Sequence, residues 1–152
     1  LLSLTRGTGI LNHSFHDYVP YCGELARRKN GVLISLENGS TTQHSLFNLQ
    51  DRGIMFLGPS EEVYTGMIIG ENNKDNDLVV NICKGKKLTN VRASGSDDTV
   101  SIAPPRIMSL EQVLGYLNDD ELAEITPTSI RLRKRHMDEN ERKRASKTQK
   151  VA

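Results

Sequence analysis

The chain has 152 residues with a net charge of +1, and only 36% of its residues are hydrophobic. This length accommodates one domain, or a small domain with appendages, and no apolar run reaches the roughly 18 residues of a membrane-spanning helix. The two cysteines have neither CxxC nor Cys/His spacing, which excludes a typical structural zinc site.

The N-terminal residues predict the end of one element followed by a strand. We expect residues 1–7 to be the end of an element that begins upstream. From Thr8 to Tyr18, alternation places Leu11 and Phe15 on one face, which predicts a strand. His13 and His16 fall on opposite faces of this strand, so they do not chelate one metal ion together.

A series of short strands is predicted next. Residues 31–37 form the first, and Asn38-Gly39 is the dipeptide preferred in type I′ hairpin turns. We therefore expect residues 41–49 to return as its hairpin partner. Further strands are expected at residues 54–57, 62–70 with a break at Gly66, 78–83 and 99–103. Short strands with turn signals between them predict a small antiparallel sheet or barrel rather than β–α–β units.

The C-terminal third predicts helices and one more strand pair. Ser109 and Gln112 have the spacing of a capping box at the start of an amphipathic helix that ends near residue 118. Residues 122–126 and 129–133 predict a strand pair around Thr126-Pro127. Asp138 favours a terminal helix over residues 139–147, whose lack of an apolar face makes it marginal alone in water.

The predicted fold class is therefore mainly β with a few helices (α+β): a small antiparallel sheet or barrel, one capped amphipathic helix and a basic, partly disordered tail.

Charge is strongly segregated along the chain. Residues 131–150 contain nine basic and three acidic residues, whereas residues 111–124 contain five acidic and no basic ones. Segregation of this kind bears on partners rather than on fold.

The polar stretch of residues 71–98 is the main candidate for a binding site. Its second half is basic and contains two glycines but no aromatic residue, so it suits contacts to phosphate and sugar better than base stacking. A solvated lysine-rich loop is the alternative. The candidate RNA contacts are Lys74, Asn76, Lys84, Lys86, Lys87, Asn90 and Arg92, with weaker contacts from the tail residues Arg131, Arg133, Lys134 and Arg135.

Motifs for catalysis are missing from the sequence. No stretch matches the phosphate-binding loop GxxxxGK[ST], and Gly7-Thr8-Gly9 lacks a third glycine at the dinucleotide spacing. The neighbouring acids Asp97-Asp98 and Asp119-Asp120 are interpreted as loop and helix-end charges rather than catalytic dyads. We therefore expect this stretch of protein to have no enzyme activity and no cofactor of its own.

Three stretches of the sequence resemble one known family. Residues 5–13, 47–53 and above all 76–95, with its run Gly85-Lys86-Lys87-Leu88-Thr89-Asn90-Val91-Arg92, resemble the C-terminal part of the BipA/TypA family. These are translational GTPases of bacteria and plastids related to elongation factor G. The similarity continues, with its spacings kept, at residues 104–105, 108–112, 119–122, 126–127 and 129–135.

The resemblance implies a domain layout and partners. Residues 1–20 would be the end of an elongation-factor-G-like fifth domain, residues 21–135 the family-specific C-terminal domain with a projecting loop at 71–98, and residues 136–152 a basic tail. GTP and Mg²⁺ would bind a domain upstream of this chain. The C-terminal domain would dock on large-subunit ribosomal RNA near the peptidyl-transferase centre, with the loop touching the acceptor end of A-site tRNA. We expect the loop to be poorly ordered without the ribosome.

Several alternatives remain at this point. The second hypothesis is a protein-interaction module. In it, the acidic helix region and the basic tail contact a protein partner, and the loop makes no contact. The resemblance implies a role in ribosome assembly and stress adaptation in the bacterial cytoplasm, with the plastid stroma as the alternative compartment. We expect no membrane association and a monomeric fragment, unless an exposed strand edge drives a non-native dimer.

Overall fold

The structure, a computed structural model, describes residues 5–21, 28–85 and 101–149. Its helices are α1 (Gln43–Leu49), the short 3-10 helix η1 (Gln50–Arg52), α2 (Leu110–Tyr116) and α3 (Glu139–Gln149). Its strands are β1 (Val32–Ser35), β2 (Gly39–Ser40), β3 (Gly53–Met55), β4 (Glu62–Val63), β5 (Met67–Asn72), β6 (Leu78–Val80), β7 (Glu121–Ile125) and β8 (Ile130–Lys134).

The main sheet has the strand order β6-β1-β5-β8-β7, and β3 also pairs with β5. One edge of β5 is occupied by β1 and the other by β8 and β3 in succession. After the turn at residues 73–77, β6 therefore has no room beside β5 and pairs with the far edge of β1, parallel to it. The prediction of a mainly β fold with a few helices is confirmed, but the sheet is mixed and open rather than purely antiparallel or closed into a barrel.

The central strands are buried on both faces. Leu33, Met67 and Ile69 pack on one side with Leu46 and Leu49 of α1. On the other side, the cluster is formed by Val32, Ile34, Ile68, Val113 of α2 and Leu132. Because successive side chains of a strand point to opposite faces, burial of both faces requires the continuous apolar runs seen in β1 and β5.

The predicted hairpin at Asn38-Gly39 is wrong. Among the described non-glycine residues only Arg6 and Ser60 have positive φ, so Asn38 does not adopt the type I′ conformation. Instead, the side chain of Thr42 accepts a hydrogen bond from the backbone N–H of Ser45 and caps α1. Residues 43–49 form a helix because Leu46 and Leu49, three positions apart, reach the core together. The short strand β2 pairs with β4 instead.

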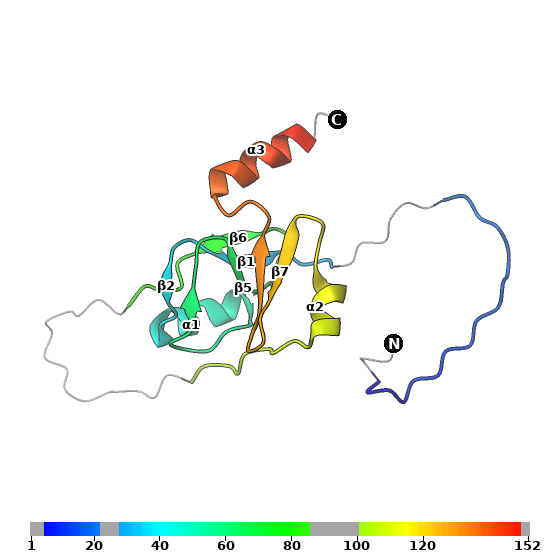
Figure 1. The fold of residues 1–152 in the computed structure, drawn as a ribbon, viewed down its shortest axis with the longest axis horizontal. Coiled ribbons are helices and arrows are strands. Elements are labelled where there is room, and N and C mark those ends of the chain that lie inside the picture. Colours follow the sequence, from blue (N-terminus) through cyan, green and yellow to red (C-terminus); the bar gives the residue numbers. More distant parts are fainter. Residues whose placement is uncertain (1–4, 22–27, 86–100, 150–152) are drawn as a thin grey trace, which may run out of the picture.

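Two other predicted strands are not formed. Residues 8–21 have no regular secondary structure, and Leu11 and Phe15 are 70% and 73% exposed. A strand requires a neighbouring backbone to bond with, and the described residues provide none for this segment, which runs away from the sheet (Figure 1). Residues 101–103 are also irregular, whereas residues 99 and 100 of that predicted strand lie outside the described part.

The other local predictions are confirmed with small shifts of boundary. Ser109 and Gln112 form the capping box of α2. The chain breaks between β4 and β5 at Gly66, whose φ is +84°. Strands β7 and β8 pair antiparallel around residues 126–129, and α3 follows as an exposed helix that stands apart from the sheet (Figure 1).

Candidate nucleic-acid interface

The predicted loop of residues 71–98 is folded over its first half. Glu71 and Asn72 belong to β5, and Leu78–Val80 form the edge strand β6. Lys84 and Gly85 follow at the end of this described part, and Lys84 is exposed. The candidates Lys86, Lys87, Asn90 and Arg92 lie outside the described residues, together with the rest of residues 86–98, the second half of the loop for which poor order was predicted.

Residues 84–103 are called here the basic segment, for the lysines and the arginine of their first half, and the first end of this segment is attached to the start of α1. The backbone N–H of Thr42 donates to the carbonyl of Ile82 (3.2 Å), and the hydroxyl of Thr42 donates to the carbonyl of Lys84 (2.8 Å). Ser45 Oγ also donates to the Ile82 carbonyl. Because the Ile82 side chain is fully buried, the chain is held in place up to Lys84 while the Lys84 side chain faces solvent.

The second end of the segment returns to the other end of α1. Gln50, the C-cap residue of α1, accepts a hydrogen bond through Oε1 from the backbone N–H of Ala103 (3.2 Å). Arg106 follows: its backbone N–H donates to the Met55 carbonyl (2.8 Å), and its guanidinium pairs with Glu71 (2.5 Å). The chain therefore leaves at the N-terminal cap of α1 and returns at the C-terminal cap.

The candidates Lys74 and Asn76 lie in the turn between β5 and β6. Their backbone carbonyls accept hydrogen bonds from the Gly31 N–H (2.8 Å) and from the side-chain amide of Asn72 (2.6 Å). Their side chains are exposed. The turn is therefore fixed by its backbone while both side chains face solvent.

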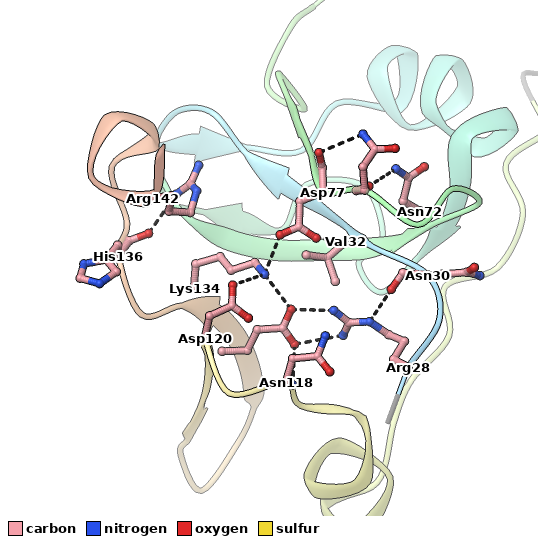
Figure 2. Close-up of polar contacts among 12 residues, drawn as sticks. Arg28, Asn30, Val32, Asn72, Asp77, Asn118, Asp120, Lys134, His136 and Arg142 are labelled. Carbon is pink, nitrogen blue, oxygen red and sulfur yellow. Dashed lines mark hydrogen bonds and ion pairs between the residues drawn. The ribbon is translucent and has the colours of Figure 1, made fainter. Parts of the chain in front are cut away.

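Five charged residues form one connected group, called here the charged cluster: Arg28, Asp77, Asp120, Glu121 and Lys134 (Figure 2). Arg28 donates to both carboxylate oxygens of Glu121, at 3.0 and 2.7 Å. The ammonium of Lys134 lies 2.7 Å from Asp77, 2.8 Å from Asp120 and 3.0 Å from Glu121. The side chains of Glu121 and Lys134 are 0% and 3% exposed, so Lys134 has no exposed donor for an RNA phosphate.

The cluster shifts the pKa values of its buried members toward the charged forms. Burial alone would raise the pKa of Glu121, but the hydrogen bond from Arg28 and the charge of Lys134 lower it below its ordinary value. Burial likewise opposes the charge of Lys134, but its hydrogen bonds with Asp120 and Asp77 raise its pKa above the ordinary value. Both groups are therefore ionised at neutral pH, and the arrangement is a structural ion-pair network.

The other tail candidates differ in how they are held. Arg133 donates to Glu124 (2.7 Å), which also accepts a hydrogen bond from the Tyr64 hydroxyl (2.6 Å). Arg135 is exposed and Arg131 is half-buried, and within the part of the chain that the structure describes neither forms an ion pair. Of the four tail candidates, these two remain available to a partner.

The sequence interpretation missed the structural role of Arg28 and Glu121. Arg28 lies in the run Arg27-Arg28-Lys29, and nothing in the local sequence distinguishes it from its neighbours. Its guanidinium stacks over the Tyr116 ring at 4.4 Å. The position of Glu121 could have been found by counting back from the turn at residues 126–129, since the hairpin register places it opposite Lys134.

The described residues contain neither a cluster of metal ligands nor a membrane-spanning helix. No group of three or more His, Cys, Asp or Glu side chains is arranged to hold a metal ion. None of the helices in this part of the chain has the length and apolar character needed to cross a bilayer.

Comparisons with known proteins identify relatives. The family model described as the TypA/BipA C-terminal domain matches residues 30–139. Proteins named large ribosomal subunit assembly factor BipA are similar along nearly the whole chain. That of Bacillus subtilis is 54% identical over 152 residues, which are 99% of this chain and 25% of the relative. Those of Salmonella typhimurium and Escherichia coli K12 are 54% and 53% identical over 150 residues, 98% of this chain and 25% of each relative. The chain thus spans about a quarter of the length of these relatives.

Proposed function

The chain belongs to the TypA/BipA family, matching its C-terminal domain, and on that premise we propose that it is the ribosome-binding region of a translational GTPase that takes part in assembly of the large ribosomal subunit. Its relatives are named for this assembly role. In this proposal the chain binds ribosomal RNA and performs no catalysis itself. GTP and Mg²⁺ are bound by another part of the complete protein, and no residue of this chain is assigned to them.

The observation that supports RNA binding best is the attachment of the basic segment at both caps of α1. Lys84 emerges exposed from a buried, hydrogen-bonded turn, and Lys86, Lys87 and Arg92 follow in the sequence before any acidic residue. The basic segment therefore contains several positively charged residues, and both of its ends are hydrogen-bonded to α1. Phosphate contacts from lysine and arginine supply a large share of the affinity for nucleic acids, and we assign to Asn90 a hydrogen bond with a base edge.

The proposed location is the large subunit near the peptidyl-transferase centre, with the basic segment against ribosomal RNA and the acceptor end of A-site tRNA. Lys74, Asn76, Arg131 and Arg135 have exposed or half-exposed side chains and are proposed as further contacts. The compartment is then the one that contains bacterial ribosomes, the cytoplasm, or the stroma if the protein is a plastid one. A role in stress adaptation, which the family resemblance implies, is part of the proposal.

The test uses the complete protein and purified large subunits. A Lys86→Ala/Lys87→Ala variant should co-sediment more weakly, and the slope of log affinity against log salt should become flatter by about one to two, since each lost phosphate contact reduces it by up to about 0.9. Lys143→Ala/Lys147→Ala in α3 is the matched control, because it removes the same charge elsewhere.

Unchanged co-sedimentation and slope for the loop variant would refute the loop assignment. Equal losses in both variants would mean that binding depends on net charge alone. The alternative, a protein-interaction module formed by the acidic region and the tail, is disfavoured because Asp120, Glu121 and Glu124 are already paired inside the domain. Deleting residues 136–152 tests it, since lost ribosome binding with an intact basic segment would favour the tail.

A further inference from the structure

Four residues of α1 are exposed, and three of them carry side chains that can combine to bind a nucleotide. His44, Phe47 and Asn48, called here the α1 face, point away from the core, whereas Ser45, Leu46 and Leu49 are buried. Phe47 is 42% exposed. The amide of Asn48 lies 3.1 Å from Nε2 of His44, so these two side chains hold each other one turn apart on the helix.

The α1 face lies between the two ends of the basic segment. The chain leaves after Lys84, which is bonded to Thr42 at the N-terminal cap, and returns at Ala103, which is bonded to Gln50 at the C-terminal cap. A helix of seven residues is only about 10 Å long, so both attachments are within a nucleotide's reach of Phe47. Figure 1 shows α1 on the side of the molecule where the chain departs after residue 85 and comes back at residue 101.

The α1 face supplies what the basic segment lacks. Residues 84–96 contain three lysines, an arginine and an asparagine but no aromatic ring. RNA is recognised through its phosphates and also through unstacked bases, which stack on aromatic side chains and hydrogen-bond to polar ones. Phe47 provides a ring, and His44 and Asn48 provide donors and acceptors beside it.

We propose that the α1 face binds an unstacked nucleotide of ribosomal RNA, with the base stacked on Phe47 and the adjacent phosphate near Lys84. This rests on the proposed function and extends it from phosphate contacts to base contacts. α1 itself contains no carboxylate, and Lys84 is exposed beside its N-terminal cap, so the positive charge that suits a phosphate lies at that end of the α1 face, opposite to Asp51 after its C-terminal end. A protein partner fits less well, since Phe47 is the one large apolar side chain on this face and its exposed helix neighbours are polar.

The test uses the complete protein and purified large subunits. Phe47→Leu keeps an apolar, helix-compatible side chain but removes the ring, and it should weaken binding about 5-fold or more, the lower range for loss of one stacked base. The slope of log affinity against log salt should not change, because no charge is lost. Phe47→Tyr should retain binding. Ile125→Leu is the control, since Ile125 is exposed on the edge strand β7 of the same domain.

Ultraviolet crosslinking of the unmodified complex gives a second measurement that does not depend on any variant. Mass spectrometry should find an RNA nucleotide attached to the tryptic peptide that contains α1. Binding by Phe47→Leu equal to that of the unmodified protein, or a crosslink from α1 to a ribosomal protein instead of RNA, would overturn the inference. If the Lys86→Ala/Lys87→Ala variant weakens binding while Phe47→Leu does not, this inference fails and the proposed function stands; if neither does, both fail.

Discussion

Replacing Lys134 by methionine would keep most of the side chain's apolar length and remove the ammonium that three carboxylates share. Lys134 is 3% exposed, and its partners Asp77, Asp120 and Glu121 come from the turn before β6 and from the start of β7. Without the ammonium, Glu121 remains completely buried with a negative charge and Arg28 as its one ion-pair partner in the described residues.

The expected loss of stability follows from the burial of each partner. Removing one member of a buried ion pair costs about 3–5 kcal/mol, because the other charge is left desolvated. Glu121 retains two hydrogen bonds from Arg28, and Asp77 and Asp120 are 38% and 60% exposed, so water can partly solvate them. We therefore expect Lys134→Met to lower the free energy of unfolding by about 3 kcal/mol, the low end of that range.

The control is the same substitution at an exposed ion pair. Lys143 lies 2.6 Å from Glu139, one turn away in α3, but the two side chains are 66% and 42% exposed. An exposed pair of this kind contributes less than about 0.5 kcal/mol. Lys143→Met therefore removes a contact of similar length and differs from Lys134→Met mainly in burial.

Urea unfolding followed by circular dichroism measures both variants. With a typical dependence of about 1–3 kcal/mol per molar urea, Lys134→Met should lower the midpoint by roughly 1 M or more, whereas Lys143→Met should hardly move it. Raising the salt concentration should leave the difference in place, since buried pairs are weakly screened. Equal midpoints for the two variants would refute the assignment of the charged cluster as a stabilising network.

Three further predictions concern stability. The folded-state pKa of Glu121 is lowered, so the contribution of its carboxylate to the free energy of unfolding is complete above the ordinary pKa and is lost as pH falls through the folded-state pKa. Below about pH 5, the urea midpoint of the unmodified protein should therefore fall more steeply than that of Glu121→Gln. Ser109→Ala removes the cap of α2 and should cost about 1 kcal/mol in urea unfolding; no change would mean that α2 is held by packing alone. Gly115→Ala, with open space around its new Cβ, should stabilise α2 by up to about 1 kcal/mol. Gly66→Ala should destabilise the domain, because φ at this position is +84° and the new Cβ would lie 2.7 Å from the Met137 backbone. Thermal melts that rank the two variants the other way would contradict this.

Features decided by a few neighbouring residues were predictable from the sequence. The capping box at Ser109, the break at Gly66 and the turn at residues 126–129 each depend on side chains within four positions of one another. All the residues that form such a feature can be seen in one short stretch of sequence. The antiparallel pairing of β7 and β8 followed from the turn alone.

The failed hairpin prediction lies where two local signals compete. Asn38-Gly39 favours a hairpin, and Thr42 with Ser45 favours a helix cap three residues later. The structure forms the helix because Leu46 and Leu49 complete the core under β1 and β5, a contact that no local pattern shows. The parallel pairing of β6 with β1 was likewise unpredictable, since it depends on both edges of β5 being occupied.

Strand pairing also changes how the charge pattern of the sequence is interpreted. The acidic stretch 111–124 and the basic stretch 131–150 look like two separate partner-binding surfaces in the sequence. The antiparallel pairing of β7 with β8 brings their facing ends together, so that Glu121 meets Lys134 and Glu124 meets Arg133. Much of the apparent excess charge is thereby neutralised inside the domain. Lys84, by contrast, is exposed, and the first acidic residue that follows it in the sequence is Asp97. The proposed RNA contact is therefore assigned to the basic segment and α1 rather than to the more strongly charged tail.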